Sequence, residues 1–370
     1  MGSVFSSSKY STDEHGVSDR ALFESYVTDE NKFSTLHDKV VAITGTSAGG
    51  MGYYLAEIAL RKQCKVLLLL NRDSGSAKKG QEGLEKLLQE YKGPTQMQAV
   101  TCDMQDLESV KKAAITVNQV AKKHGGLDIL ICNAGIMATR DKRTAAGLEV
   151  QMQTNQLSHF LLTQMVWPSI QMAADKRGDA RVVTHSSSAR DTPSGMLQQK
   201  FFVKSQEGTL GGDKTWFISE MLGYEGPWTR YHQTKLANAC FSMELHNKLQ
   251  AKGITNIKSM TADPGLASSN LQVNSTRGDG LMSDWMAKLL MPNGQSAENG
   301  SLPVAMCAFS PEADSGDMYM PEKITTGPPM KCIAGNKPVK KGGEKLTCDP
   351  ENQAHVWQWC EDALEIKFEV

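Results

Sequence analysis

The stretch that decides the fold of this chain is Val40-Val41-Ala42-Ile43-Thr44-Gly45-Thr46-Ser47-Ala48-Gly49-Gly50-Met51-Gly52. Its first five residues form an apolar, β-branched run that predicts a short buried strand. A helix-like pattern follows, with Leu55, Ile58 and Ala59 on one side. A glycine-rich turn between a strand and a helix lets the backbone approach a pyrophosphate, whose charge the helix N-terminus favours. The stretch therefore predicts a dinucleotide site, although such a turn also occurs as an ordinary tight turn.

The next strand-like run, residues 66–70, ends in Asn71-Arg72. Chains that bind NAD usually carry an acidic residue at this point, where it holds the ribose hydroxyls. A guanidinium in its place favours a 2′-phosphate, so Arg72 predicts NADP(H) in preference to NAD(H). The alternative is a solvated arginine at the end of a strand.

Four further strand-like segments continue the series, and each ends in small or polar residues. They are residues 97–100 before Thr101-Cys102-Asp103, 127–131 before Cys132-Asn133-Ala134-Gly135, 181–184 before His185-Ser186-Ser187-Ser188, and 257–262 before Asp263-Pro264-Gly265. Residues 154–162 have a helical pattern. Strands that alternate with helices predict an α/β fold, a Rossmann-type doubly wound parallel sheet with helices on both faces and its site at the carboxyl ends of the strands.

The run Tyr231-His232-Gln233-Thr234-Lys235 carries the chemistry. On a helix, residues i and i+4 share a face, so the charge of Lys235 lies beside the hydroxyl of Tyr231. A free phenol has a pKa of roughly 10, and each unit by which a cation lowers it is worth about 1.4 kcal/mol. The pair predicts a proton-transfer site. Tyr319 and Lys323 have the same spacing, but Pro321 between them would break the helix.

With these motifs in order, the chain resembles the short-chain dehydrogenase/reductase family from about Asp38 to about Phe309. The resemblance implies that Tyr231 is the general acid in reduction or the base in oxidation, and that Lys235 lowers its pKa and reaches the nicotinamide ribose. It implies that Ser187 orients the substrate oxygen, with Ser186 or Ser188 as the alternatives. It further implies that Asn155 holds a relay water.

Pattern and resemblance together assign the cofactor contacts. The set is Gly45, Ser47, Gly49, Gly50, Met51, Gly52, Arg72, Asp103, Asn133, Ala134, Gly135, Tyr231, Lys235, Pro264 and Gly265. Asp103 would meet the adenine and Gly265 would flank the nicotinamide. Gly45 and Gly50 enclose one residue more than the family's usual turn, so Gly49 is the alternative to Gly50.

An insertion at about residues 191–227 separates Ser187 from Tyr231. The two residues are 44 positions apart, far more than is usual in the family. The segment and its flank contain Phe201, Phe202, Trp216, Phe217, Tyr224 and Trp228, interspersed with glycines. Aromatic residues on a glycine-jointed loop suggest a lid over a bulky apolar substrate. A hydrophobic cluster that packs the loop onto the body, or a contact with another subunit, is the alternative.

Within the family, residues 154–162, the Arg72-Asp73 pair, Leu236-Ala237-Asn238 and the insertion are most similar to retinol dehydrogenases and light-dependent protochlorophyllide reductases. We therefore expect an NADP(H)-dependent oxidoreductase that acts on a carbonyl or alcohol of a bulky lipophilic substrate, such as a retinoid, steroid or pigment. One alternative is protochlorophyllide-reductase-like C=C reduction. The other is a non-catalytic dinucleotide-binding scaffold or subunit of the same fold, against which the intact Ser187, Tyr231 and Lys235 argue.

Composition limits the other functions. A net charge of −1 and a pI of about 6.7 give no reason to expect nucleic-acid binding. The eight cysteines form no Cys-x-x-Cys pair and the eight histidines no ligand-spaced pair, so we expect reduced thiols and no metal site. No run approaches the roughly twenty apolar residues that span a bilayer.

The ends of the chain extend the predicted domain at residues 38–310. Residues 1–37 are polar and Ser-rich, which predicts a loosely held arm, and Gly2 fits the pattern for N-myristoylation. One acyl chain without a basic cluster binds membranes reversibly, so we expect a cytoplasmic protein that is peripheral on a membrane if acylated, with an organelle location left open. Residues 311–370 predict an extension packed on the same domain. It would cap the substrate pocket, join protomers in a homo-oligomer or assembly, or cover the sheet edge.

Overall fold

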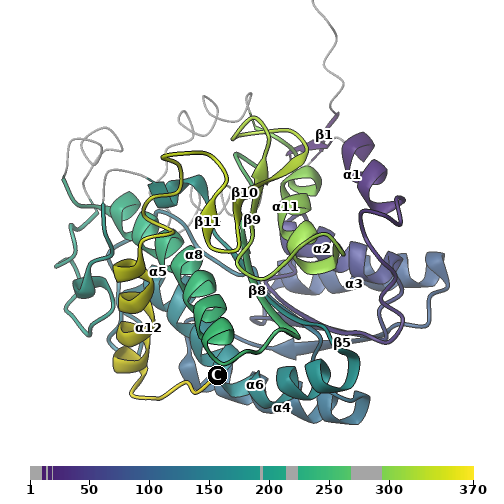
Figure 1. The fold of residues 1–370 in the computed structure, drawn as a ribbon, viewed down its shortest axis with the longest axis horizontal. Helices are drawn as coiled ribbons and strands as arrows, with labels where there is room; N and C mark the ends of the chain where they lie inside the picture. The colour runs from purple at the N-terminus through teal and green to yellow at the C-terminus, as the bar shows by residue number, and fades with distance from the viewer. Residues whose placement is uncertain (1–10, 14–15, 19, 192–194, 214–223, 268–293) are drawn as a thin grey trace, which may run out of the picture.

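The computed structural model describes residues 11–13, 16–18, 20–191, 195–213, 224–267 and 294–370. Within these residues, one central sheet has the strand order β11-β10-β9-β8-β7-β6-β3-β4-β5 (Figure 1). Helices cover both of its faces, which confirms the predicted doubly wound α/β fold. Gly2, Trp216 and Phe217, on which the acylation and part of the lid hypothesis depend, lie outside the described residues.

Seven neighbouring strands of this sheet are parallel, and a hairpin closes one edge. The parallel strands are β3 (Val40–Thr44), β4 (Val66–Asn71), β5 (Gln96–Thr101), β6 (Ile129–Cys132), β7 (Ala180–His185), β8 (Ile257–Ala262) and β9 (Met318–Pro321). The antiparallel strands are β10 (Pro329–Ala334) and β11 (Lys337–Pro338). A separate antiparallel pair consists of β1 (Ser11–Asp13) and β2 (Gly16–Ser18).

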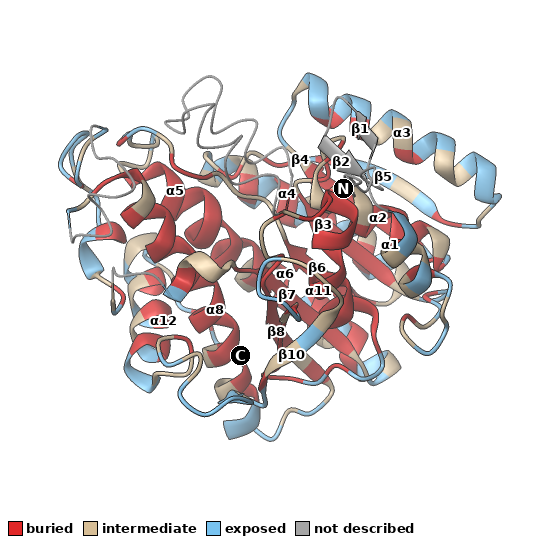
Figure 2. Ribbon diagram, turned by 90° about the horizontal axis from the view of Figure 1, so that it is seen from above, coloured by how far each residue is buried: buried red, intermediate tan, exposed pale blue. Residues whose placement is uncertain are grey.

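Alternating side chains of the strands build two hydrophobic cores. On β3, Val40 and Ala42 face one core, whereas Val41 and Ile43 face the other. The first core is covered by α4 (Leu107–His124), α6 (Ser158–Arg177), α8 (Pro227–Ala251) and α12 (Pro350–Leu364), and the second by α1 (Arg20–Val27), α2 (Met51–Arg61), α3 (Gly75–Tyr91) and α11 (Ala297–Phe309). Figure 2 shows that buried residues concentrate in the sheet and in the helices that cover it.

The chain reverses the direction in which it adds strands at β3. From β3 it proceeds through β4 to β5 on one side, and then from β6 to β9 on the other. In such sheets, ligands bind outside the carboxyl ends of the strands where the order reverses. The crevice between β3 and β6 is therefore where the fold positions a site.

The predicted loose arm at residues 1–37 is wrong from Arg20 onward. Phe23, Phe33 and Leu36 are buried in the core beside α2 and α11. Arg20 also pairs with the buried Glu57 of α2 at 2.5 Å. The polar composition of the whole segment hid a few apolar residues at helical spacing, and these are enough to dock a short helix.

The C-terminal extension completes the body of the molecule. Its strands β9, β10 and β11 lengthen the sheet, and α12 packs on α8. Trp357 of α12 is 5% exposed and stacks on Phe241 and Phe368, with ring centroids 5.8 and 4.8 Å away. Of the three roles that the sequence left open, the described residues fit a cover for the sheet edge.

We propose that residues 311–370 unfold together with the rest of the domain, and Trp357→Ala tests this. The substitution should lower the free energy of unfolding by about 3–5 kcal/mol, because it removes a buried aromatic ring and leaves a cavity. Denaturant unfolding, followed by tryptophan fluorescence and circular dichroism, measures the loss. The control is Gln358→Ala on the exposed side of α12, which should change stability by less than about 0.5 kcal/mol. Two separate transitions, or a loss below about 1 kcal/mol, would contradict the proposal.

Candidate active site

The glycine-rich turn after β3 has the geometry of an anion-binding loop. Gly45 and Gly49 have φ of 75° and 72°, which other residues rarely adopt. Gly50 caps α2 without a side-chain hydrogen bond, and the first turn of α2 has no acidic residue. A Cβ on Gly52 would lie 2.3 Å from the carbonyl oxygen of Gly45. Gly49 thus takes the left-handed position in the lengthened turn, and Gly52 permits close packing of turn and helix.

A cavity of about 560 Å³ opens at the carboxyl ends of the strands beside this turn. Of the predicted site residues, those that line it are Gly45, Ser47, Gly50, Met51, Arg72, Asp103, Asn133, Ala134, Gly135, Tyr231, Lys235 and Pro264. The predicted residues outside the lining are Gly49, Gly52, Asn155, Ser187 and Gly265. The volume and the glycine-lined helix N-terminus fit a dinucleotide, whose pyrophosphate would lie against α2.

One end of the cavity carries basic side chains that face solvent. Asn71 at the end of β4 accepts a hydrogen bond from the Thr46 backbone N–H at 2.7 Å, which ties the strand end to the turn. Arg72 follows it, and Lys79 on the first turns of α3 lines the same cavity. The sequence analysis did not identify Lys79 as a cofactor contact. Its position one turn into the helix that follows Arg72 could have indicated that role. An anionic group is favoured here by two cations and by the N-terminus of α3.

Tyr231, Lys235 and Ser187 meet at the other end. Both Tyr231 and Lys235 are on α8, and the Lys235 ammonium lies 5.8 Å from the centroid of the Tyr231 ring. The Ser187 side chain, in the loop after β7, lies near enough to the Tyr231 hydroxyl to act on its pKa, which it lowers. Lys235 Nζ donates a hydrogen bond to the His185 carbonyl oxygen at 2.7 Å. The structure thus brings the predicted acid, its neighbouring cation and the predicted serine together.

The three adjacent serines have different surroundings. Ser186 is buried and donates its hydroxyl hydrogen to the Lys235 carbonyl oxygen at 2.7 Å. Ser188 begins the 3₁₀ turn η2 (Ser188–Asp191). Ser186 lines the cavity, but its hydroxyl hydrogen is already used; Ser187 is the serine whose side chain acts on the Tyr231 hydroxyl.

Burial dominates the titration of the pair. It raises the pKa of Tyr231 well above its usual value, while the nearby Ser187 side chain opposes this rise. Burial also lowers the pKa of Lys235 to about 8, and the charge of Asp263 opposes that shift. The predicted lowering of the Tyr231 pKa is therefore wrong in direction, because desolvation of the phenolate is the largest influence on it and the charge of Asp263 adds to the rise. Tyr231 retains its proton at neutral pH and is poised as an acid.

A buried polar network joins the strand ends to α8. His159 contacts Thr44 Oγ1 through Nε2 and the Asn155 carbonyl oxygen through Nδ1, both at 2.9 Å. Since a carbonyl only accepts, Nδ1 is assigned the proton. Burial lowers the pKa of His159 to about 4, so the ring is neutral. His185 similarly bonds to Asn133 Oδ1 at 2.9 Å. Both histidines thus position the crevice as uncharged partners.

Asn155 lies in the π-helical segment η1 (Gln153–Leu157), which follows α5 (Val150–Met152) and continues into α6. Its side-chain amide exchanges two hydrogen bonds with the Ile136 backbone, at 2.8 and 2.9 Å, and donates a third to Thr234 Oγ1. Its carbonyl oxygen also accepts from Asn238 Nδ2 at 2.7 Å. These bonds brace the loop after β6 against α8. The relay water assigned to Asn155 stays a prediction.

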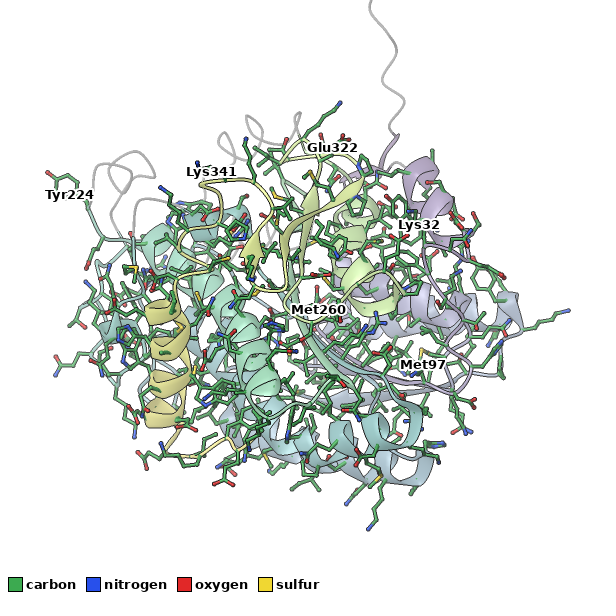
Figure 3. The ribbon with its side chains drawn as sticks, viewed as in Figure 1. Lys32, Met97, Tyr224, Met260, Glu322 and Lys341 are labelled. Carbon is green, nitrogen blue, oxygen red and sulfur yellow. The ribbon has the colours of Figure 1, made fainter. Side chains whose placement is uncertain are left out.

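A few apolar residues anchor the described part of the insertion to the body, while most of its other residues are exposed. Phe201, in the 3₁₀ turn η3 (Gln199–Phe201), and Phe202 are buried in the first core. Tyr224 is 65% exposed and points outward (Figure 3). Trp228 packs against Tyr231, with ring centroids 6.3 Å apart, in a small apolar cluster with Met137. The insertion therefore contributes a hydrophobic cluster at Phe201 and Phe202, as one of its alternatives predicted, and Trp228 at its end lies at the site.

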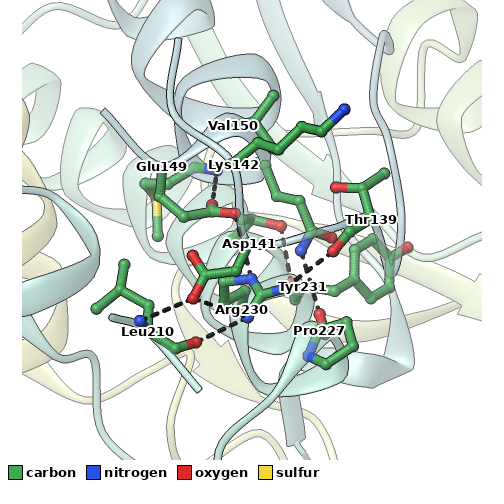
Figure 4. A network of polar contacts seen from close by, with 12 residues as sticks. Thr139, Asp141, Lys142, Glu149, Val150, Leu210, Pro227, Arg230 and Tyr231 are labelled. Carbon is green, nitrogen blue, oxygen red and sulfur yellow. Dashed lines mark hydrogen bonds and ion pairs between the residues drawn. The ribbon is translucent and has the colours of Figure 1, made fainter. Parts of the chain in front are cut away.

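A buried arginine fastens the insertion to the helix that carries Tyr231 (Figure 4). Arg230 donates hydrogen bonds to the carbonyl oxygens of Leu210, Gly212 and Thr139 at 2.7, 3.0 and 2.9 Å. Its guanidinium lies 3.7 Å from Asp141 and 3.4 Å from Glu149. Neither this arginine nor its partners emerged from the sequence, because the contacts join distant segments.

Glu149 in this network should make stability depend on pH. Burial raises its pKa from 4.5 to about 7 against the opposing charge of Arg230. Its contribution is then fully present below about pH 4.5 and is lost as the pH rises to about 7. Over this window, the free energy of unfolding of the wild type should fall by about 2–3 kcal/mol more than that of Glu149→Gln. The control is Glu85→Gln on exposed α3, and equal pH slopes for wild type and Glu149→Gln would refute the assignment.

Comparison with known proteins finds that this chain is similar to short-chain dehydrogenases/reductases. The family model for short chain dehydrogenases matches residues 39–198. The short-chain dehydrogenase/reductase prx1 of Penicillium rubens is 26% identical over 91% of this chain and 88% of its own length. A short-chain dehydrogenase/reductase of Armillaria gallica is 29% identical over 90% of this chain and 92% of its own length.

The fold is also found among solved structures. The crystal structure of an uncharacterized protein from Mycobacterium paratuberculosis aligns with a TM-score of 0.62 and 24% identity. The alignment covers 91% of this chain and 97% of that chain. The likeness extends over both the nucleotide half and the half that carries Tyr231.

Proposed function

We propose that this chain, a short-chain dehydrogenase/reductase by its similarity to relatives of that family over most of its length, is an oxidoreductase that uses NADP(H) and acts on a carbonyl or alcohol of a bulky lipophilic substrate. The observation that carries the proposal is that Tyr231 and Lys235 line the cavity with the Lys235 ammonium 5.8 Å from the Tyr231 ring, while the Ser187 side chain acts on the Tyr231 hydroxyl. This arrangement can protonate an oxygen without help from solvent.

The chain's own residues supply the proton and the orientation. In reduction, Tyr231 donates its proton to the substrate oxygen while Ser187 holds that oxygen by a second hydrogen bond. A cationic Lys235 stabilises the tyrosinate that remains, which is a charge that burial alone disfavours. When bound, the nicotinamide supplies or accepts the hydride. In oxidation the same groups run in reverse, with Tyr231 as the proton acceptor.

The first test is Tyr231→Phe, assayed by the absorbance of the reduced nicotinamide over a panel of retinoid, steroid and small carbonyl substrates. We expect turnover to fall by about 10²–10⁴, because the acid is removed while the ring is kept. Nucleotide affinity should change little.

The matched control is Tyr319→Phe, which alters a buried tyrosine of β9 with the same Tyr-x-x-x-Lys spacing and should keep wild-type turnover. Equal turnover in Tyr231→Phe and wild type would remove Tyr231 from its role, and a wild type that binds NADP(H) without turning over any substrate would favour the scaffold alternative.

The preference for NADP(H) is supported by the basic end of the cavity. Arg72 and Lys79 line it, and Arg72 stands where an NAD-binding chain usually carries a carboxylate, which would repel a 2′-phosphate. Each charge-assisted hydrogen bond to a phosphate is worth about 1.5–3 kcal/mol. Two such cations are sufficient for a clear preference.

Arg72→Ala should therefore weaken NADPH binding about 10- to 100-fold and leave NADH binding nearly unchanged. Titration calorimetry with both nucleotides gives the ratio of dissociation constants. Lys78→Ala is the control, because Lys78 pairs with Asp73 at 2.9 Å and does not line the cavity. A loss of the same size for both nucleotides would show that Arg72 does not read the 2′-phosphate.

The lipophilic substrate is supported by the apolar cluster around Tyr231. Met137 and Ala138 are buried next to the ring, and Ala189 and Trp228 pack against them. A large apolar substrate gains more from apolar side chains beside the acid than a small polar one.

A further inference from the structure

A second buried arginine, Arg190, lies in the loop that carries Ser187. Arg190 is 1% exposed, at the end of the 3₁₀ turn that follows Ser187. Its Nη1 donates to Asp263 Oδ2 at 2.6 Å. Its Nε and Nη2 donate to both oxygens of Glu344, at 2.9 and 2.5 Å. One guanidinium is thus shared between two carboxylates, with Asp191 3.8 Å away.

The three charged residues come from three different segments of the active site. The backbone N–H of Arg190 donates to the Ser187 carbonyl oxygen at 3.0 Å, so the arginine is rigidly connected to the serine loop. Asp263 accepts from the Gly265 backbone N–H at 2.8 Å and precedes Pro264, which lines the cavity. Glu344 belongs to the C-terminal extension, between β11 and α12.

We propose that Arg190 and Glu344 are positioning residues, through which the C-terminal extension aligns the Ser187 loop with the Asp263-Pro264-Gly265 loop and keeps Lys235 cationic. The inference rests on the proposed function but assigns it a new element, namely a carboxylate from the extension.

The effect of Arg190 and Glu344 on the charge of Lys235 follows from the charged and titratable groups around Lys235. Asp263 faces it from the end of β8, whereas His185 at the end of β7 and His159 on α6 are held neutral by burial. Tyr231 on the same helix is also neutral. Asp263 is therefore the charge that supports the ammonium, and it opposes the burial that lowers the pKa of Lys235 to about 8. Because Glu344 occupies two donors of Arg190, the guanidinium only partly neutralises Asp263.

Removal of the Glu344 charge should therefore change the pKa of Lys235, although Glu344 does not contact it. In Glu344→Gln, Arg190 loses the carboxylate that takes two of its donors and neutralises Asp263 more fully, which weakens the negative field at Lys235, with the more distant Asp191 left unchanged. The pKa of Lys235 should then fall, and properties that need the cation should be lost at a lower pH. Two such properties can be measured independently: the affinity for NADPH, whose cavity Lys235 lines, and turnover in the direction of reduction.

The matched control lies at the opposite end of the same strand. Arg181 near the start of β7 is also buried and pairs with Asp179 at 2.9 Å. Asp179→Asn removes one carboxylate from a buried arginine, as Glu344→Gln does, but far along the strand from the crevice. It should lower thermal stability without changing the pH dependence of NADPH affinity.

The experiment measures NADPH affinity by calorimetry, and turnover on the panel, at intervals across about pH 6–10, where Lys235 titrates. We expect the alkaline midpoint of Glu344→Gln to move down by about half a unit or more, with turnover reduced about 10-fold. Glu344→Asp keeps the charge but not the reach, so its midpoint should stay near that of wild type while its turnover falls.

Three outcomes overturn the inference: a wild-type midpoint and turnover in Glu344→Gln, an equal shift in Asp179→Asn, or full turnover in Glu344→Asp. If Glu344→Gln fails to fold, Glu344→Asp still decides the positioning part, and its unchanged turnover would refute it. Failure of the proposed function looks different, because the wild type itself would then not bind NADPH or would not depend on Tyr231.

Discussion

The proposed function requires the ammonium of Lys235 to stay charged where it is only 5% exposed, and the polar groups of the crevice fit that requirement. A backbone carbonyl, that of His185, accepts one of its hydrogens. The two imidazoles nearby are buried and neutral, so they satisfy hydrogen bonds without adding a second positive charge. Asp263 supplies the opposing charge from the next strand end. A crevice with protonated histidines in the same positions would discharge the lysine and leave Tyr231 without its cation.

The strand pattern and the Tyr231–Lys235 spacing were predictable because each depends on local periodicity. Val41 and Ile43 face one core and Val40 and Ala42 the other, as a strand buried on both faces requires. The direction of the Tyr231 pKa was not predictable, because burial is a property of the tertiary structure. The same holds for Arg190, whose carboxylate partners lie 73 and 154 residues away. No periodicity connects such positions.

The insertion and the C-terminal extension are each attached near the site by a buried arginine. The insertion is held at Arg230, next to Tyr231, and the C-terminal extension at Arg190, three residues after Ser187. Arg230 faces two carboxylates and Arg190 three, and Arg230 also bonds to three backbone carbonyls. A planar fork with five donors suits this task, since it joins several segments at fixed angles where lysine would offer a single point of charge.

Stability alone does not explain these clusters. Desolvation offsets most of the attraction in a buried ion pair, so well-packed apolar side chains of similar volume would hold the segments about as strongly. An apolar cluster, however, creates no electric field. At Arg190 the excess of carboxylates lies beside the buried amine that must remain protonated, and this excess is what a neutral replacement would lose. At Arg230 the guanidinium instead satisfies the carbonyls of Leu210 and Gly212, which the folded insertion buries and which only a donor can satisfy. The charged cluster at Arg190 therefore matters for the electric field it creates at Lys235, whereas the guanidinium of Arg230 matters for the hydrogen bonds it donates.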